Sequence, residues 1–193
     1  RTHNIDKGLD PMEPLVHFIV PFAALLLVGV GFRKALPISL LALLPDVDAL
    51  FLVHRSLSHS IVVILSAMAP LLLLTYKFKP RLHGYVFLAL LAVASHLVLD
   101  LFAGYTPLLW PLYGHSVWIQ AELVAHIGGS ASLSPSIKLL TKPITFQPFR
   151  SLDAPLFTGE GLILSAVLLT PVFFKAFKAW WQRARYSREL VSD

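Results

Sequence analysis

The sequence predicts an all-α fold, a polytopic transmembrane helix bundle of about five spans, within a range of four to six. Composition is the first reason. Of the 193 residues, 56% are hydrophobic and 14% are charged, and the mean hydropathy is +0.71. Such a chain has too little polar surface to face water. The second reason is that several apolar runs approach the roughly 17 to 25 residues that a helix needs to cross a hydrocarbon core about 30 Å thick.

The first apolar run, residues 15–32, has the position of a secretory signal peptide. It ends at Phe32-Arg33-Lys34 instead of at a small-residue cleavage site, so we predict a retained helix. Residues 1–11 precede Met12, a natural initiator, and we expect them to be a non-native leader ahead of one membrane domain, residues 12–193. The predicted spans are 15–32, 36–53, 60–76, 84–103 and 158–179.

The stretch 105–157 is rich in Pro, Gly and Ser, so we expect it to lie mostly outside the membrane, with a re-entrant or surface helix near 108–127. Glu122 and His126 are four residues apart in it. A surface amphipathic helix explains this pair better than a second metal site.

Charge sets the predicted orientation. With the N-terminus outside and the C-terminus inside, the inner connections carry ten Lys and Arg residues and the outer ones six, as the positive-inside rule requires. The net charge of +5 is therefore explained by short clusters beside apolar runs. No basic face interleaved with aromatic residues is seen, so we expect no nucleic-acid partner.

The first polar element is Pro45-Asp46-Val47-Asp48, inside an apolar run. Ionisable groups in a membrane span are costly and mark function unless they are solvated. Carboxylates two residues apart point to different sides of a regular helix, so both can address one site only if the backbone departs from the helix, as Pro45 allows. The alternative is a short helix that ends at the surface with solvated acids.

The second element follows directly, as His54-Arg55-Ser56-Leu57-Ser58-His59-Ser60. Two histidines five apart fit one helical face poorly, but a turn can direct both imidazoles inward. Arg55 offers a planar cation for an anionic substrate. An interfacial loop explains the serines and one histidine, but it does not explain why both histidines adjoin the paired aspartates.

The third element is His96 and Asp100, whose four-residue spacing puts imidazole and carboxylate on one helical face, either as ligands of one metal or as a hydrogen-bonded pair. In the predicted topology the polar residues converge on the outer half of the bilayer. Asp46 lies roughly 15 Å from Leu36 and Asp100 about 24 Å from Gly84, and His17 is at the outer end of the first span. The chain has no cysteine, so a metal here takes nitrogen and oxygen ligands.

The order of these motifs, closed by Trp110-Pro111-Leu112, resembles the membrane-bound metal-dependent hydrolases of the YdjM type over residues 12–112. The usual family motif is His-Arg-Gly-x-Thr-His-Ser, and here Ser56 and Ser58 replace the Gly and the Thr. The metal ligands implied by the resemblance are His17, Asp46, Asp48, His54, His59, His96 and Asp100.

From this set we expect a divalent metal, zinc first with Mn or Fe as alternatives, in one or two ions. The expected activity is hydrolysis by a metal-activated water, with Asp48 or Asp46 as base and Arg55 neutralising charge on the substrate. The expected substrate is a phospholipid or lipid-linked phosphoester at the outer interface of the cell membrane. Two alternatives are a metal ion or proton transporter that uses the same residues and a noncatalytic protein whose metal staples its helices.

Overall fold

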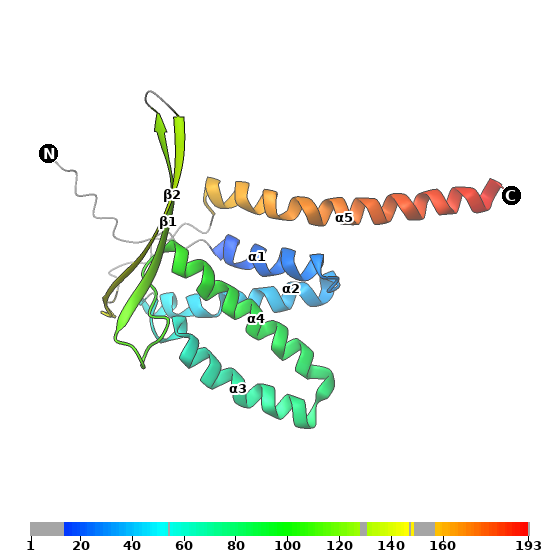
Figure 1. Cartoon of the computed structure of the whole chain (residues 1–193). Coiled ribbons are helices and arrows are strands. Elements are labelled where there is room, and N and C mark those ends of the chain that lie inside the picture. The colour runs from blue at the N-terminus through cyan, green and yellow to red at the C-terminus, as the bar shows by residue number, and fades with distance from the viewer. Residues whose placement is uncertain (1–13, 54, 128–130, 147, 149–156, 193) are drawn as a thin grey trace.

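The computed structural model describes residues 14–53, 55–127, 131–146, 148 and 157–192, and Figure 1 shows their arrangement. Five α-helices, three short 3₁₀ helices and one pair of strands follow one another along these residues. In chain order they are α1 (Pro14–Leu27), α2 (Phe32–Leu40), η1 (Leu41–Leu43), η2 (Pro45–Phe51), η3 (Leu57–His59), α3 (Ile61–Phe78), α4 (Pro80–Ala103), β1 (His115–Ile127), β2 (Ala131–Pro143) and α5 (Gly159–Ser192).

Three helices in the described part of the chain are long and apolar enough to cross a membrane: Ile61–Phe78, Pro80–Ala103 and Gly159–Arg183. They coincide with the predicted spans 60–76, 84–103 and 158–179. The first predicted span is shorter than expected, because α1 has 14 residues and is about 21 Å long at 1.5 Å per residue. It ends before Gly29, whose φ of 94° turns the chain into α2.

The second predicted span, 36–53, is not a regular helix. The α-helical part ends at Leu40, and the chain continues through η1 and η2, which begins at Pro45. Proline has no N–H to donate to the preceding turn, so it breaks the α-helical hydrogen-bond ladder here. The departure from α-helix that Pro45 predicts is therefore present, and it falls on the two aspartates.

The all-α prediction is wrong, because β1 and β2 form a two-stranded antiparallel sheet in place of the helix expected near 108–127. The pairing runs from His115 opposite Pro143 to Ile127 opposite Ala131. Apart from Trp118, side chains on β1 alternate between polar and apolar from Ser116 until Val124, a period of two that suits a strand and not a helix. The apolar set is Val117, Ile119, Ala121 and Leu123, and the polar set includes Ser116, Gln120 and Glu122.

The hairpin lies across one end of the helices (Figure 1). Thr106 and Val117 exchange two backbone hydrogen bonds of 2.9 Å, and the Trp118 indole donates to the Phe102 carbonyl at 3.2 Å. We call this end, with the start of α3 and the end of α4, the hairpin end. The opposite end, with the α1–α2 turn (28–31) and the α3–α4 turn at Lys79, is the turn end.

Helix α4 is central, since it packs against α1, α2 and α3. The main buried cluster includes Ala35, Ala42 and Ala92, which are 0–2% exposed. Such small residues let membrane helices approach closely. Helix α5 packs along α1, where the Lys175 ammonium donates to the Leu27 carbonyl at 2.6 Å and so satisfies the end of that helix.

Candidate metal centre

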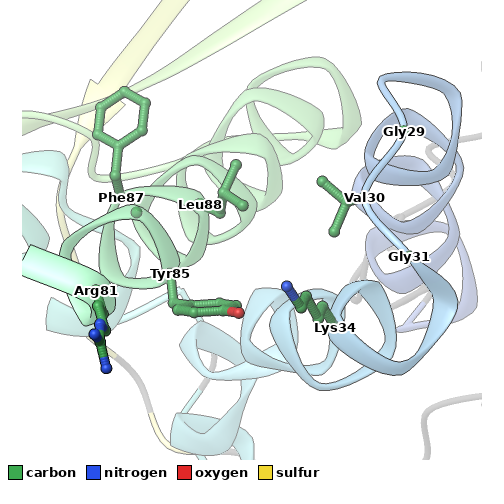
Figure 2. A pocket seen from close by; sticks show the side chains of 9 residues that line it. Gly29, Val30, Gly31, Lys34, Arg81, Tyr85, Phe87 and Leu88 are labelled. Carbon is green, nitrogen blue, oxygen red and sulfur yellow. The ribbon is translucent and has the colours of Figure 1, made fainter.

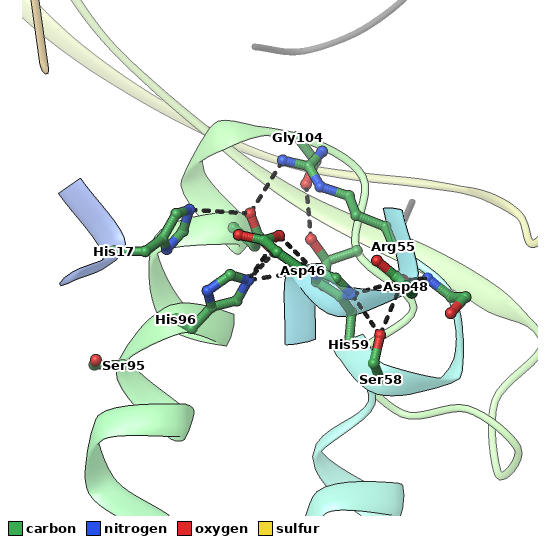
Figure 3. Close-up of polar contacts among 12 residues, drawn as sticks. His17, Asp46, Asp48, Arg55, Ser58, His59, Ser95, His96 and Gly104 are labelled. Carbon is green, nitrogen blue, oxygen red and sulfur yellow. Dashed lines mark hydrogen bonds and ion pairs between the residues drawn. The ribbon is translucent and has the colours of Figure 1, made fainter. Parts of the chain in front are cut away.

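Polar side chains from four elements meet at the hairpin end (Figure 3). Helix α1 supplies one histidine, η2 two aspartates, the η3 region a histidine and an arginine, and α4 a histidine and an aspartate. Burial of this many ionisable groups is costly unless they are paired or bind an ion. The histidines of η3 and α4 are fully buried. The members are His17, Asp46, Asp48, Arg55, His59, His96 and Asp100, which we call the His–Asp cluster.

Four atoms of the cluster point at one another. The Nε2 atoms of His59 and His96 are 3.2 Å apart. Asp46 Oδ1 is 3.5 Å from the Nε2 of His59 and 3.4 Å from that of His96. Asp100 Oδ2 is 3.1 Å and 3.3 Å from the same two nitrogens. These five separations define a compact group of two nitrogens and two oxygens.

Ligand atoms in the cluster lie close enough together to share an ion. Those of Asp46, His59 and His96 lie within 4.8 Å of one another, and so do those of His17, His96 and Asp100. Two imidazoles and two carboxylates also suit zinc, manganese or iron(II). The residues present therefore fit a divalent ion.

Charge points the same way. The cluster holds three carboxylates, on Asp46, Asp48 and Asp100, and one permanent cation, on Arg55. With neutral histidines, the form that binds a metal, these groups sum to two negative charges, which is unfavourable in a buried site. A divalent cation would cancel this charge, and without one a proton on His59 offsets part of it.

Asp100 uses its second oxygen on the opposite side. Its Oδ1 accepts a hydrogen bond from Arg55 Nη2 at 3.2 Å and lies 3.7 Å from His17 Nε2. The His17 ring stacks on His96, with ring centroids 3.9 Å apart. His17 and Arg55 thus flank the converging atoms, and His17 forms a candidate metal-binding triad with His96 and Asp100.

Asp48 lies behind His59. Its Oδ2 is 3.3 Å from His59 Nδ1, and it accepts hydrogen bonds from the Ser56 backbone N–H at 2.8 Å and the Ser58 hydroxyl at 2.9 Å. A carboxylate on the far nitrogen of a metal-binding histidine fixes the ring's orientation and raises its basicity. The structure thus places Asp46 among the converging atoms and Asp48 as the residue that orients His59.

The local backbone explains how both aspartates reach one histidine. In the 3₁₀ helix η2, Asp46 and Asp48 approach opposite nitrogens of His59. The loop that follows contains two residues in the left-handed region, Leu52 with φ of 57° and Arg55 with φ of 53°. Such a conformation costs about 1–3 kcal/mol per residue without glycine, and at Arg55 it accompanies the contact with Asp100.

The proton on His59 depends on the same contacts. Burial alone disfavours the charged ring, but hydrogen bonds to Asp100, Asp46 and Asp48 outweigh it and raise the pKa of His59 to about 10. His59 lies outside the three membrane-crossing helices. Without a metal ion its ring keeps a proton at neutral pH, and a metal ion bound at His59 would have to displace that proton. The affinity for such an ion would therefore increase as the pH rises toward this pKa.

Six of the seven predicted ligands are thus brought together, and the seventh, His54, lies outside the described residues. Their assignment as ligands stays a prediction. Sequence reasoning missed the role of Ser58, although the family motif has a Thr there and both side chains carry a hydroxyl donor. Glu122 is exposed on β1, where residues four apart are separated by about 13 Å, so the helical pairing with His126 is wrong.

The family model described as YdjM inner membrane protein matches residues 12–179. This match confirms the resemblance and extends it past residue 112, through the hairpin and into α5. No curated protein and no solved structure matches the chain.

Proposed function

The chain belongs to the YdjM inner membrane protein family, and we propose that it is a membrane-embedded hydrolase that uses one divalent ion, zinc first, to cleave a phosphoester at the membrane interface. The observation that carries the proposal is the convergence of buried imidazole nitrogens and carboxylate oxygens from His59, His96, Asp46 and Asp100.

His59, His96 and Asp100 would hold the ion, because their side chains are the most buried, at 0–3% exposed. A divalent ion supplies a Lewis acid that lowers the pKa of a bound water toward neutrality. Asp46 is the most exposed corner of the group, with 13% of its side chain accessible. We assign its carboxylate as the base that takes the proton from the attacking water, while Asp48 keeps His59 oriented.

Arg55 is the substrate-binding residue in this proposal. Its guanidinium already lies 3.2 Å from Asp100 at the edge of the cluster, and its side chain is 10% exposed. A guanidinium presents two parallel donors to phosphate oxygens and stays charged at any physiological pH. It would neutralise the phosphoryl oxygens as their charge increases during the attack.

The depth of the cluster supports a substrate presented at the interface. His17 is in the first turn of α1, Asp100 in the last turn of α4, and His59 directly before α3. A phospholipid or polyprenyl-phosphate lipid carries its phosphoester at this level. Transport, the rival function, expects ion ligands near the bilayer midplane with access from both sides.

The test compares wild type with His59→Ala and Asp100→Ala in hydrolysis of a lipid phosphoester panel, in liposome metal flux and in metal content. His115→Ala is the matched control, since His115 lies on β1 outside the cluster. We expect metal-dependent hydrolysis by wild type and His115→Ala that both cluster variants lose. If the variants lose metal but wild type hydrolyses none of the lipids, the helix-staple function is favoured. If wild type carries a metal flux across liposomes that both variants lose, transport is favoured.

A further inference from the structure

A second site lies at the turn end, away from the His–Asp cluster (Figure 2). It is a cavity of about 460 Å³ between the α1–α2 turn and the first turns of α4. Its lining includes Gly31, Lys34, Arg81, Gly84 and Tyr85. Gly84 is 12 residues before His96 on α4, which is about 18 Å along a helix. The cavity is thus separate from the proposed catalytic centre.

The cavity is positively charged. Lys34 and Arg81 both line it, and no acidic residue does among the residues described there. The Lys34 ammonium lies 5.4 Å from the centre of the Tyr85 ring, a cation–π contact that holds it at the cavity. Figure 2 shows Lys34 and Tyr85 facing each other across the space between α2 and α4.

Two helices begin at this cavity. Helix α2 starts at Phe32, directly after the lining residue Gly31, and α4 starts at Pro80, directly before the lining residue Arg81. The dipole of a helix N-terminus favours an anion, as do the two lining cations, Lys34 and Arg81. An anionic group is the ligand that this arrangement fits.

The remaining walls are apolar. Val30, Phe87 and Leu88 line the cavity beside the cations. The large side chains Phe32, Leu82 and Phe87 at this end are 48–60% exposed, as expected of groups that face lipid. A free phosphate ion gains nothing from such walls, whereas a lipid contacts them with its acyl chains.

We propose that the turn-end cavity binds an anionic phospholipid, with its phosphate between Lys34 and Arg81 and the start of its acyl chains against Leu88. Phosphatidylglycerol has the required chemistry, an exposed phosphodiester without a cationic headgroup. This binding is independent of the proposed hydrolysis at the opposite end of the helices. The bound lipid contacts both the α1–α2 turn and the start of α4, and so links these two segments.

Native mass spectrometry of the purified full chain tests the proposal, with equal amounts of phosphatidylglycerol and phosphatidylcholine added in detergent. We expect preferential retention of phosphatidylglycerol by wild type. The double variant Lys34→Gln/Arg81→Gln should lose at least tenfold in that retention. Lys178→Gln, which removes a cation from α5 away from the cavity lining, is the matched control and should bind as wild type does.

A cavity-filling variant gives a second test, which keeps both cations. A Cβ built at Gly84 meets no atom within 4 Å, so Gly84→Leu adds a side chain to the cavity wall, and leucine has a higher helix propensity than glycine. We expect lost phosphatidylglycerol retention at unchanged thermal stability. Equal retention of both lipids by wild type, or unchanged retention in Gly84→Leu, would overturn the proposal. Binding of glycerol phosphate as tight as that of the lipid would show a soluble-anion site instead.

Discussion

His59 is the residue around which the cluster is arranged. Its Nε2 faces Asp46, His96 and Asp100, and its Nδ1 faces Asp48. Each nitrogen therefore has a different task, one toward the converging ligand atoms and one toward an orienting carboxylate. The side chain is fully buried, so water does not substitute for either contact.

Asp48→Asn tests this division of tasks. The amide oxygen can still accept from the Ser56 backbone N–H, but the negative charge beside His59 Nδ1 is lost. We expect zinc affinity to fall about 10–100-fold, the usual effect of removing such a partner, with the fold retained. Competition against a chelator of known affinity measures it. Glu122→Gln, the same chemical change at an exposed position of β1, is the control, and equal affinity of both variants would refute the assigned role.

Residue types were predictable here, and their geometry was not. The spacing of His96 and Asp100 places both on one face of a helix, and the structure has them 3.3 Å apart. The sequence identifies Asp46 and Asp48 as a pair but contains no sign of which nitrogen of His59 each one meets. That depends on the 3₁₀ geometry of η2 and on the turn after Leu52. His17 entered through its predicted depth at the outer end of the first span and through the family resemblance, because a lone histidine has no spacing to interpret.

Among the elements, the start of α3 links the cluster to the segment before the hairpin. Ser60 accepts a hydrogen bond from the Val63 N–H as the N-cap of α3, and its hydroxyl donates to the carbonyls of Leu108 and Trp110. The Ile61 N–H also donates to the Leu108 carbonyl at 2.9 Å. These contacts hold η3, and with it His59, against the chain that leads into β1.

Ser60→Ala removes the cap and the donor to the part-buried carbonyls of Leu108 and Trp110, so we expect a loss of about 1–2 kcal/mol in unfolding free energy. Thermal unfolding in one detergent measures the change. Ser66→Ala is the matched control, because Ser66 is exposed and bonds only within its own helix, to the Val62 carbonyl. Equal melting temperatures for the two variants would show that the link has no stabilising role.

Element prediction succeeded where one lipid-facing run forms one helix. The spans 60–76, 84–103 and 158–179 match α3, α4 and the start of α5, because length and hydropathy suffice to define a membrane helix. Element prediction failed in the outer segment, because β1 is stabilised by pairing with β2 and not by spanning the membrane on its own. A period of two was present in Val117, Ile119 and Leu123, and it is the signal that identifies the strand.

At the scale of the whole molecule, the two ends differ in character. The hairpin end holds buried carboxylates and imidazoles, and the turn end holds lysines, arginines and the anionic-lipid cavity. Because the positive-inside rule puts the basic end inside, the His–Asp cluster belongs to the outer half of the bilayer. This orientation remains a prediction.

Because the chain has no cysteine, the predicted orientation can be tested directly with single introduced cysteines. Ser132→Cys places a thiol on β2 and Lys178→Cys places one on α5, and both positions are exposed. In intact cells a membrane-impermeant maleimide should label position 132, and it should label position 178 only after lysis. The reverse pattern would require a C-out topology and would put the cluster in the inner half.

The central claim is that the His–Asp cluster binds one divalent metal ion, and metal content tests it most directly. Elemental analysis of protein purified without chelator should give one divalent ion per chain in wild type and in His115→Ala. In His59→Ala and His96→Ala, each of which removes one of the converging nitrogens, the ion should be lost. Metal-free wild-type protein that takes up no zinc, or metal content unchanged in both cluster variants, would contradict the claim.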